Sequence, residues 1–153
     1  MFSTVLKMYK CNCPIYTLFS VPADGFSVKA PKNSPTSGQL TFKTVITNEG
    51  QGYDTDTGLF TCSVPGFYYF YASLLKTYSH SSRVLCYIKT NTESVLLYVK
   101  PGSTDREGFL PLTNSFYVHL EAGEIVKLTD CTAAATFDSS SAFSGFLVSR
   151  DSL

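Results

Sequence analysis

The chain has 153 residues, and its 12 basic and 12 acidic residues leave a formal net charge of zero. A neutral chain without runs of basic residues lacks the positive surface that non-specific phosphate binding requires, so no nucleic-acid partner is expected. Its apolar stretches are all shorter than about ten residues, whereas a membrane-spanning helix needs about 20, so no membrane insertion is expected.

Residues 1–25 are predicted to be a flexible leader ahead of one folded domain at 26–150. Lys7 and Lys10 interrupt the apolar start, so the continuous apolar core of a signal peptide is not recognisable. Cys11 and Cys13 are separated by one residue, whereas zinc and thioredoxin-type sites usually space their cysteines by two or more. We therefore interpret this pair as part of the leader, available for disulfides between chains.

Short apolar runs separated by turn residues fill the chain after the leader. They are rich in Val, Ile, Phe, Tyr and Thr, and several alternate apolar and polar residues at period two, which is typical of strands. The predicted strands are Phe26–Ala30, Leu40–Thr47, Leu59–Val64, Phe67–Leu75, Val84–Thr90, Ser94–Lys100, Ser115–Glu121, Glu124–Asp130 and Ala142–Ser149. About nine strands without an intervening helix favour an all-β antiparallel sandwich or jelly roll.

The segment 54–58 is superficially similar to the start of a calcium-binding EF-hand loop. The twelfth position of such a loop would be Pro65, where a bidentate Glu is required, and no flanking helices are predicted. We instead expect a turn in which Asp54 and Asp56 accept hydrogen bonds from nearby backbone amides and Gly58 adopts a positive φ.

The sequence contains two histidines, His80 and His119, and none of the usual catalytic motifs. No nucleophile elbow, phosphate-binding glycine loop or paired-histidine zinc helix occurs. His119 falls within a predicted strand, where a single histidine is usually a surface or packed residue. His80 falls within a predicted exposed loop and is a candidate ligand contact. The protein is therefore not expected to be an enzyme.

Several ordered motifs resemble the globular head of complement C1q over 26–149. They are Thr47-Asn48, Tyr53-Asp54, Thr57-Gly58, the run Phe60–Phe70, the strand Ser115–Leu120 with Gly123-Glu124, and the closing Phe143–Val148. The resemblance implies the ten-stranded jelly roll shared with tumour necrosis factor and assembly as a tight homotrimer. A trimer interface would also account for the high aromatic content, 14% of the chain, and the low charged content of 16%.

Most residues in the matched motifs are interpreted as parts of the fold and not as ligand contacts. The predicted structural core consists of Phe42, Tyr53, Gly58, Phe60, Gly66, Tyr69, Phe70, Phe143, Gly145 and Phe146. Among the glycines, Pro65-Gly66 is expected to form a tight turn, and Gly145 is expected to allow a close contact within the sheet.

The resemblance also implies a Cys62–Cys86 disulfide, which would leave Cys131 as a buried thiol or as a partner for another chain. Some members of the family hold calcium near the trimer axis. The corresponding step in this chain ends in Pro111, which has no side-chain ligand, so calcium is possible here only through the upstream Asp105 and Glu107. No other cofactor is expected.

By resemblance, the leading hypothesis is a secreted recognition module of innate immunity that binds carbohydrates, microbial surfaces or protein ligands in a lectin-like manner. The predicted ligand contacts are Tyr78, His80, Arg83, Lys100, Asp105, Arg106 and Glu107. Three copies of such a loop surface gain avidity from weak single sites. The alternatives are a signalling ligand that resembles a trimeric cytokine or synaptic organiser, and a matrix protein cross-linked through Cys11 and Cys13.

Overall fold

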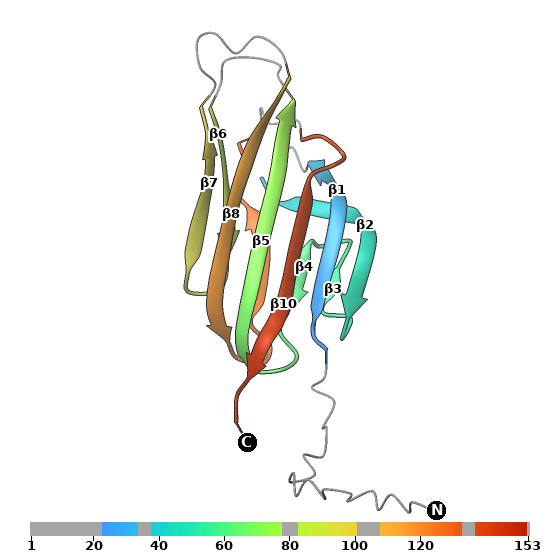
Figure 1. The fold of residues 1–153 in the computed structure, drawn as a ribbon, viewed down its shortest axis with the longest axis vertical. Helices are drawn as coiled ribbons and strands as arrows, with labels where there is room; N and C mark the ends of the chain where they lie inside the picture. The colour runs from blue at the N-terminus through green and yellow to red at the C-terminus, as the bar shows by residue number, and fades with distance from the viewer. Residues whose placement is uncertain (1–22, 34–37, 78–82, 101–107, 133–136, 153) are drawn as a thin grey trace, which may run out of the picture.

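The computed structural model describes residues 23–33, 38–77, 83–100, 108–132 and 137–152, which form ten strands and no helix (Figure 1). The strands are β1 (Gly25–Asn33), β2 (Leu40–Glu49), β3 (Tyr53–Asp54), β4 (Leu59–Thr61), β5 (Gly66–Thr77), β6 (Val84–Lys89), β7 (Ser94–Val99), β8 (Phe109–Leu120), β9 (Ile125–Thr129) and β10 (Ala142–Arg150). These described residues therefore contain no helix that is long and apolar enough to cross a bilayer.

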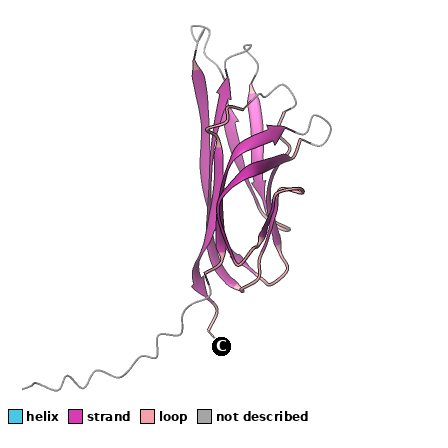
Figure 2. Ribbon diagram, turned by 90° about the vertical axis from the view of Figure 1, so that its right-hand side faces the viewer, coloured by secondary structure: helices cyan, strands magenta, loops and turns pink. Residues whose placement is uncertain are grey.

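The strands build two five-stranded antiparallel sheets that pack face to face. The order is β2-β1-β10-β5-β8 in one sheet, here called the front sheet, and β3-β4-β9-β6-β7 in the other, the back sheet. Figure 1 looks onto the front sheet, and Figure 2 shows the two layers from the side. Strands β8 and β10 both end at the lower end of Figure 1, where β1 and β5 begin. This two-layer arrangement confirms the predicted jelly roll.

Each predicted strand is present, although β1 ends three residues later and β4 three residues earlier than predicted, and two further differences are larger. Strand β3 was missed because two residues carry no periodic signal. Strand β8 begins at Phe109, six positions earlier than predicted, and runs through Pro111. The proline is tolerated because β8 is the edge strand of the front sheet, where the missing N–H breaks no ladder bond between two central strands.

The core between the sheets is a cluster of aromatic rings. Phe26 lies at its centre, with its ring centroid 4.8 Å from Tyr53, 5.1 Å from Phe60 and 5.0 Å from Phe143. The predicted core residues Phe42, Tyr53, Phe60, Phe70 and Phe143 are all at most 3% exposed, which confirms their assignment. Glycines 58, 66 and 145 are confirmed as structural, because a Cβ at any of them would lie within 2.4 Å of a neighbouring atom.

The core assignment of Tyr69 and Phe146 was wrong. These residues are directly opposite each other on β5 and β10, with ring centroids 5.8 Å apart, and they point away from the core. Because side chains alternate along a strand, burial of Phe70 turns Tyr69 outward, and burial of Gly145 turns Phe146 outward. Tyr69 is half-buried in the outer surface, whereas Phe146 is 53% exposed.

The predicted Cys62–Cys86 disulfide was also wrong, since Cys86 is bonded to Cys131 and Cys62 is a buried free thiol. Strand β9 lies between β4 and β6, so the two expected partners are on opposite sides of it. The amide of Cys62 bonds to Glu124 just before β9, whereas Cys131 follows the other end of β9 beside Cys86. A five-residue strand spans about 17 Å, well beyond the reach of a disulfide.

The turn at 54–58 forms largely as expected. The carboxylate of Asp54 accepts hydrogen bonds from the amide of Asp56 (2.8 Å) and the hydroxyl of Thr57 (2.9 Å), which lower the pKa of Asp54. Gly58 has a φ of 72°, as predicted. The role expected for Asp56 was wrong, because its carboxylate accepts a hydrogen bond from Lys43 Nζ at 2.8 Å and not from a backbone amide.

A buried carboxylate anchors the start of β1. Asp24 is 3% exposed, and its Oδ2 accepts hydrogen bonds from the hydroxyls of Tyr68 (2.6 Å) and Ser63 (2.9 Å). Its backbone carbonyl accepts a hydrogen bond from the amide of Leu147 on β10. Asp24 therefore ties β1, β5 and β10 together at the lower end of the front sheet. Sequence analysis missed this role, because Asp24 reaches partners that are distant along the chain.

Candidate functional site

Exposed and half-buried aromatic side chains lie on the outer surface of the front sheet. We call this group, Phe67, Tyr69, Tyr71, Tyr117 and Phe146, the outer aromatic face. The ring centroids of Phe67 and Tyr117 are 5.5 Å apart with an interplanar angle of 13°, so these two rings form a stacked ridge across β5 and β8. Tyr117 is 56% exposed and Phe67 is 41% exposed. A contiguous apolar patch of this kind marks an interaction surface in a soluble domain.

A shallow groove lies beside the outer aromatic face, over β2, β1 and β10. It has a volume of about 320 Å³ and a mainly apolar lining. Within the groove, β1 and β10 carry the small outward side chains Ser27 and Ser144. Their hydroxyl oxygens are 3.1 Å apart. Phe146 and Thr47 line its sides. The front sheet therefore presents a protruding ridge and a recess on the same surface.

Two of the predicted ligand contacts, Arg83 and Lys100, lie next to each other in the structure. Arg83 precedes β6 and Lys100 follows β7, and these strands pair at Val84 and Val99. Both basic residues are exposed. They belong to the upper end of the molecule in Figure 1, opposite to the lower end where β8 and β10 stop.

The other predicted contacts lie outside the described residues: Tyr78, His80, Asp105, Arg106 and Glu107. Their role in ligand binding therefore stays a prediction, as does calcium binding by Asp105 and Glu107. The same holds for interchain disulfides through Cys11 and Cys13, which also lie outside this part of the chain.

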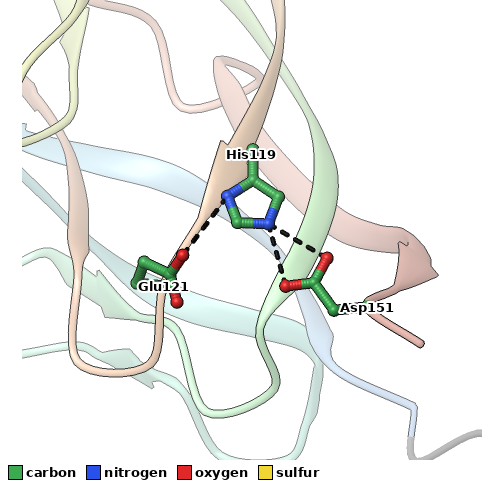
Figure 3. Close-up of side chains that lie close together, drawn as sticks. All are labelled: His119, Glu121 and Asp151. Carbon is green, nitrogen blue, oxygen red and sulfur yellow. Dashed lines mark hydrogen bonds and ion pairs between the residues drawn. The ribbon is translucent and has the colours of Figure 1, made fainter. Parts of the chain in front are cut away.

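A group of three potential metal ligands lies at the lower end of the front sheet (Figure 3). His119 on β8 is near Glu121, which follows the same strand, and Asp151, which follows β10. The prediction of His119 as a surface or packed residue is confirmed, because its side chain is 34% exposed. The alternation along β8 places Glu121 on the side of His119, but no sequence signal points to Asp151, which is 32 positions away.

The free thiol of Cys62 is not suited to nucleophilic chemistry. Its side chain is buried and donates to the carbonyl of Val64 at 3.3 Å. Burial raises the pKa of Cys62, so the thiolate needed for attack is disfavoured. Its environment is that of a structural cysteine.

The sequence matches the family model of the C1q domain at residues 25–148. The chain belongs to the C1q domain family. It is 30% identical over 151 residues to human complement C1q tumor necrosis factor-related protein 5, covering 93% of this chain and 57% of that protein. It is 28% identical over 132 residues to a bovine complement C1q subcomponent, covering 83% of this chain and 52% of that protein. The chain thus spans little more than half the length of these curated relatives.

Solved structures of other proteins share the fold of this chain. The globular domain of zebrafish complement 1qA superposes with a TM-score of 0.66 at 21% identity, covering 84% of this chain and 99% of that one. Murine APRIL, crystallised at pH 5.0, superposes with a TM-score of 0.61 at 13% identity, covering 82% and 99%. At these identities the likeness establishes the fold alone.

Proposed function

We propose that this protein is a secreted, non-enzymatic recognition protein that acts as a homotrimer and binds carbohydrate or protein ligands through the upper end of each copy. Membership of the C1q domain family supports a role in ligand binding. The outer aromatic face is the observation that carries the assembly, since it is the surface that a single copy leaves exposed. Recognition of microbial surfaces in innate immunity is the role that this family membership favours.

The outer aromatic face, together with the groove beside it, has the chemistry of an interface between copies. Aromatic side chains bury about 150–250 Å² each, so five partly exposed rings contribute roughly 400 Å². A stable interface buries about 800 Å² on each partner, and the apolar groove beside the rings adds to this area. Self-association is therefore the arrangement that removes this apolar surface from water.

The ridge and the groove are different patches, so a contact between them joins unlike surfaces of two copies. Such head-to-tail contacts close into a ring when the rotation that relates neighbouring copies is one full turn divided by a whole number. In a three-membered ring, the stacked Phe67 and Tyr117 of one copy would lie in the groove of the next, near its Ser27 and Ser144. This arrangement covers the ridge and the groove of every copy.

Substitution of Tyr117 tests the assembly. Light scattering on the purified chain is expected to give the mass of three copies for the wild type and of one copy for Tyr117→Ser. The matched control is Tyr98→Ser, because Tyr98 is 49% exposed on β7 of the back sheet and its loss should leave the trimer intact. A monomeric wild type at micromolar concentration would refute the assembly.

The exposed pair Arg83 and Lys100 favours a ligand with negative charge or many hydroxyl groups. Three such pairs at one end of a trimer would bind a repetitive surface with avidity, even if each single contact is weak. We expect the double variant Arg83→Ala/Lys100→Ala to lose binding on arrays of glycans and bacterial polysaccharides. Lys43→Ala is the control, because it removes one exposed positive charge elsewhere, from the ion pair with Asp56.

Array experiments also separate this function from that of a signalling ligand. Binding to acidic glycans that depends on Arg83 and Lys100 would support surface recognition. Tight binding to a cell-surface protein, with no signal across the glycan arrays, would replace it with the signalling role. Addition of a calcium chelator to the same arrays tests the calcium prediction at Asp105 and Glu107.

A further inference from the structure

His119, Glu121 and Asp151 come together at the lower end of the front sheet from different stretches of the chain (Figure 3). His119 Nε2 lies 3.0 Å from both carboxylate oxygens of Asp151, and His119 Nδ1 lies 3.9 Å from Glu121 Oε1. One ligand atom from each of the three residues can be chosen so that all lie within 4.8 Å of one another. The imidazole lies between the two carboxylates, with Nε2 toward Asp151 and Nδ1 toward Glu121 (Figure 3).

The backbone of each of these residues is held in place. His119 pairs with Phe67 in the β5–β8 ladder, and the amide of Asp151 donates to the carbonyl of Pro65 at 3.0 Å. The amide of Glu121 donates to the carboxylate of Glu124 at 2.8 Å, and the amide of Glu124 returns a bond to the carbonyl of Glu121. Ligands that project from fixed backbone need little reorganisation to bind an ion.

The imidazole ring is also oriented by its neighbours. The rings of His119 and Phe67 lie 5.1 Å apart at an interplanar angle of 74°, and Phe67 in turn stacks on Tyr117. This edge-on packing limits rotation of the imidazole. The side chain of His119 nevertheless remains 34% exposed, while those of Asp151 and Glu121 are 46% and 72% exposed. An ion can therefore reach the three groups from solvent.

We propose that His119, Glu121 and Asp151 form a binding site for a divalent transition-metal ion, best suited to zinc. Imidazole nitrogen and carboxylate oxygen are preferred zinc ligands, with bonds of about 2.0–2.2 Å. Calcium and magnesium favour sets made of oxygen alone, so the imidazole disfavours them. Three protein ligands leave a coordination position for water or for a group from another molecule.

Stability alone does not account for bringing these groups together. Exposed ion pairs contribute only about 0–1 kcal/mol, and the two carboxylates repel each other unless a positive charge lies between them, which His119 supplies only when it is protonated. A bound divalent ion supplies that charge. It would also join the end of β8 to the segment after β10, and it would raise the melting temperature by binding only the folded chain.

The test is a zinc titration followed by calorimetry on the full chain without an affinity tag. Cys11→Ser and Cys13→Ser are introduced in every sample, because thiolates are strong zinc ligands. We expect one zinc ion per chain, and we expect an excess of calcium not to displace it. His119→Gln and Asp151→Asn are each expected to weaken zinc binding at least tenfold. His80→Gln is the matched control, because it removes the only other histidine and should leave the affinity unchanged.

Circular dichroism on the same samples checks that each variant is folded, and light scattering checks its oligomeric state. If His119→Gln does not fold, Glu121→Gln takes its place, since Glu121 is mostly exposed and its loss should not disturb the fold. Equal zinc affinity in the wild type and in all three ligand variants would overturn the proposal, as would no binding at millimolar zinc. The three groups would then be an ion-pair cluster only. Neither outcome depends on ligand recognition, and the light scattering shows whether the oligomeric state differs between samples.

Discussion

The inner and outer surfaces of the front sheet use the same kind of side chain for different purposes. On β5, Tyr68 and Phe70 point inward and are fully buried, while Phe67 before them and Tyr71 after them point outward and are about 40% exposed. Inward rings pack against the back sheet and hold one chain together. Outward rings face away from the back sheet and contact other side chains on the outer surface, as Phe67 contacts Tyr117 and His119. The aromatic residues of this strand therefore stabilise the fold on one side and, in our proposal, the association of copies on the other.

The two surfaces should respond differently to substitution. Inner substitutions should lower the free energy of unfolding of the single chain strongly, because they remove contacts between the sheets. Outer substitutions should barely change that free energy and should act on the association of copies instead.

Phe70→Ala should have the largest effect. Phe70 is fully buried, and its ring contacts those of Phe60, Tyr68 and Phe143. Truncation leaves a cavity and should lower the free energy of unfolding by about 4 kcal/mol. Urea denaturation followed by fluorescence measures this loss. A change below about 1 kcal/mol would contradict the assignment of Phe70 to the core.

Because of Tyr53, the free energy of unfolding should decrease at alkaline pH. Burial raises the pKa of Tyr53 to about 12 from 10.0, so the folded chain holds the phenolic proton more tightly than the unfolded one. Its contribution is fully present below pH 10 and is lost as the pH rises from 10 to 12, by about 2 kcal/mol.

Denaturation at several pH values checks this prediction against Tyr53→Phe, which should show a shallower decline. The decline should not vanish, because burial, with a further contribution from the bond to Asp24, also raises the pKa of Tyr68. An unchanged profile in Tyr53→Phe would show that Tyr53 is not the titrating group.

Tyr68→Phe tests the polar contact at the lower end of the inner surface. The substitution keeps the ring but removes the hydroxyl that donates to Asp24 at 2.6 Å. Hydrogen bonds to charged groups contribute about 1.5–3 kcal/mol, so we expect a loss of about 2 kcal/mol at neutral pH. The double variant Tyr68→Phe/Asp24→Asn separates the contact from the burial of the carboxylate. Additive losses would mean that the two groups do not interact.

Phe146→Ser should have the smallest effect on the single chain and a large effect on assembly. Phe146 is 53% exposed, so its loss should change the free energy of unfolding of a monomer by no more than about 0.5 kcal/mol. The same substitution removes a ring from the outer aromatic face and should shift the mass seen by light scattering toward one copy. A stable trimer in this variant would place the interface elsewhere.

The disulfide illustrates the limit of sequence reasoning. Five cysteines and a resemblance led to Cys62–Cys86, but the insertion of β9 between β4 and β6 separates these residues and brings Cys131 to Cys86. Closing this loop of 45 positions should stabilise the fold by about 4 kcal/mol in the chain-entropy model. The order of the strands decides which cysteines pair, and the residues adjacent to each cysteine do not reveal that order.

From its sequence alone, this chain is recognisable as an all-β domain with the motifs of the C1q head, because alternation at period two and turn residues are local properties. Local patterns also located Phe42, Phe60 and Phe143 in the core. Only the tertiary structure decided which aromatic residues point outward, how Cys131 pairs, and that Asp151 meets His119. These contacts depend on which strands are neighbours and on their register, and both are set by packing across the whole domain rather than by adjacent residues.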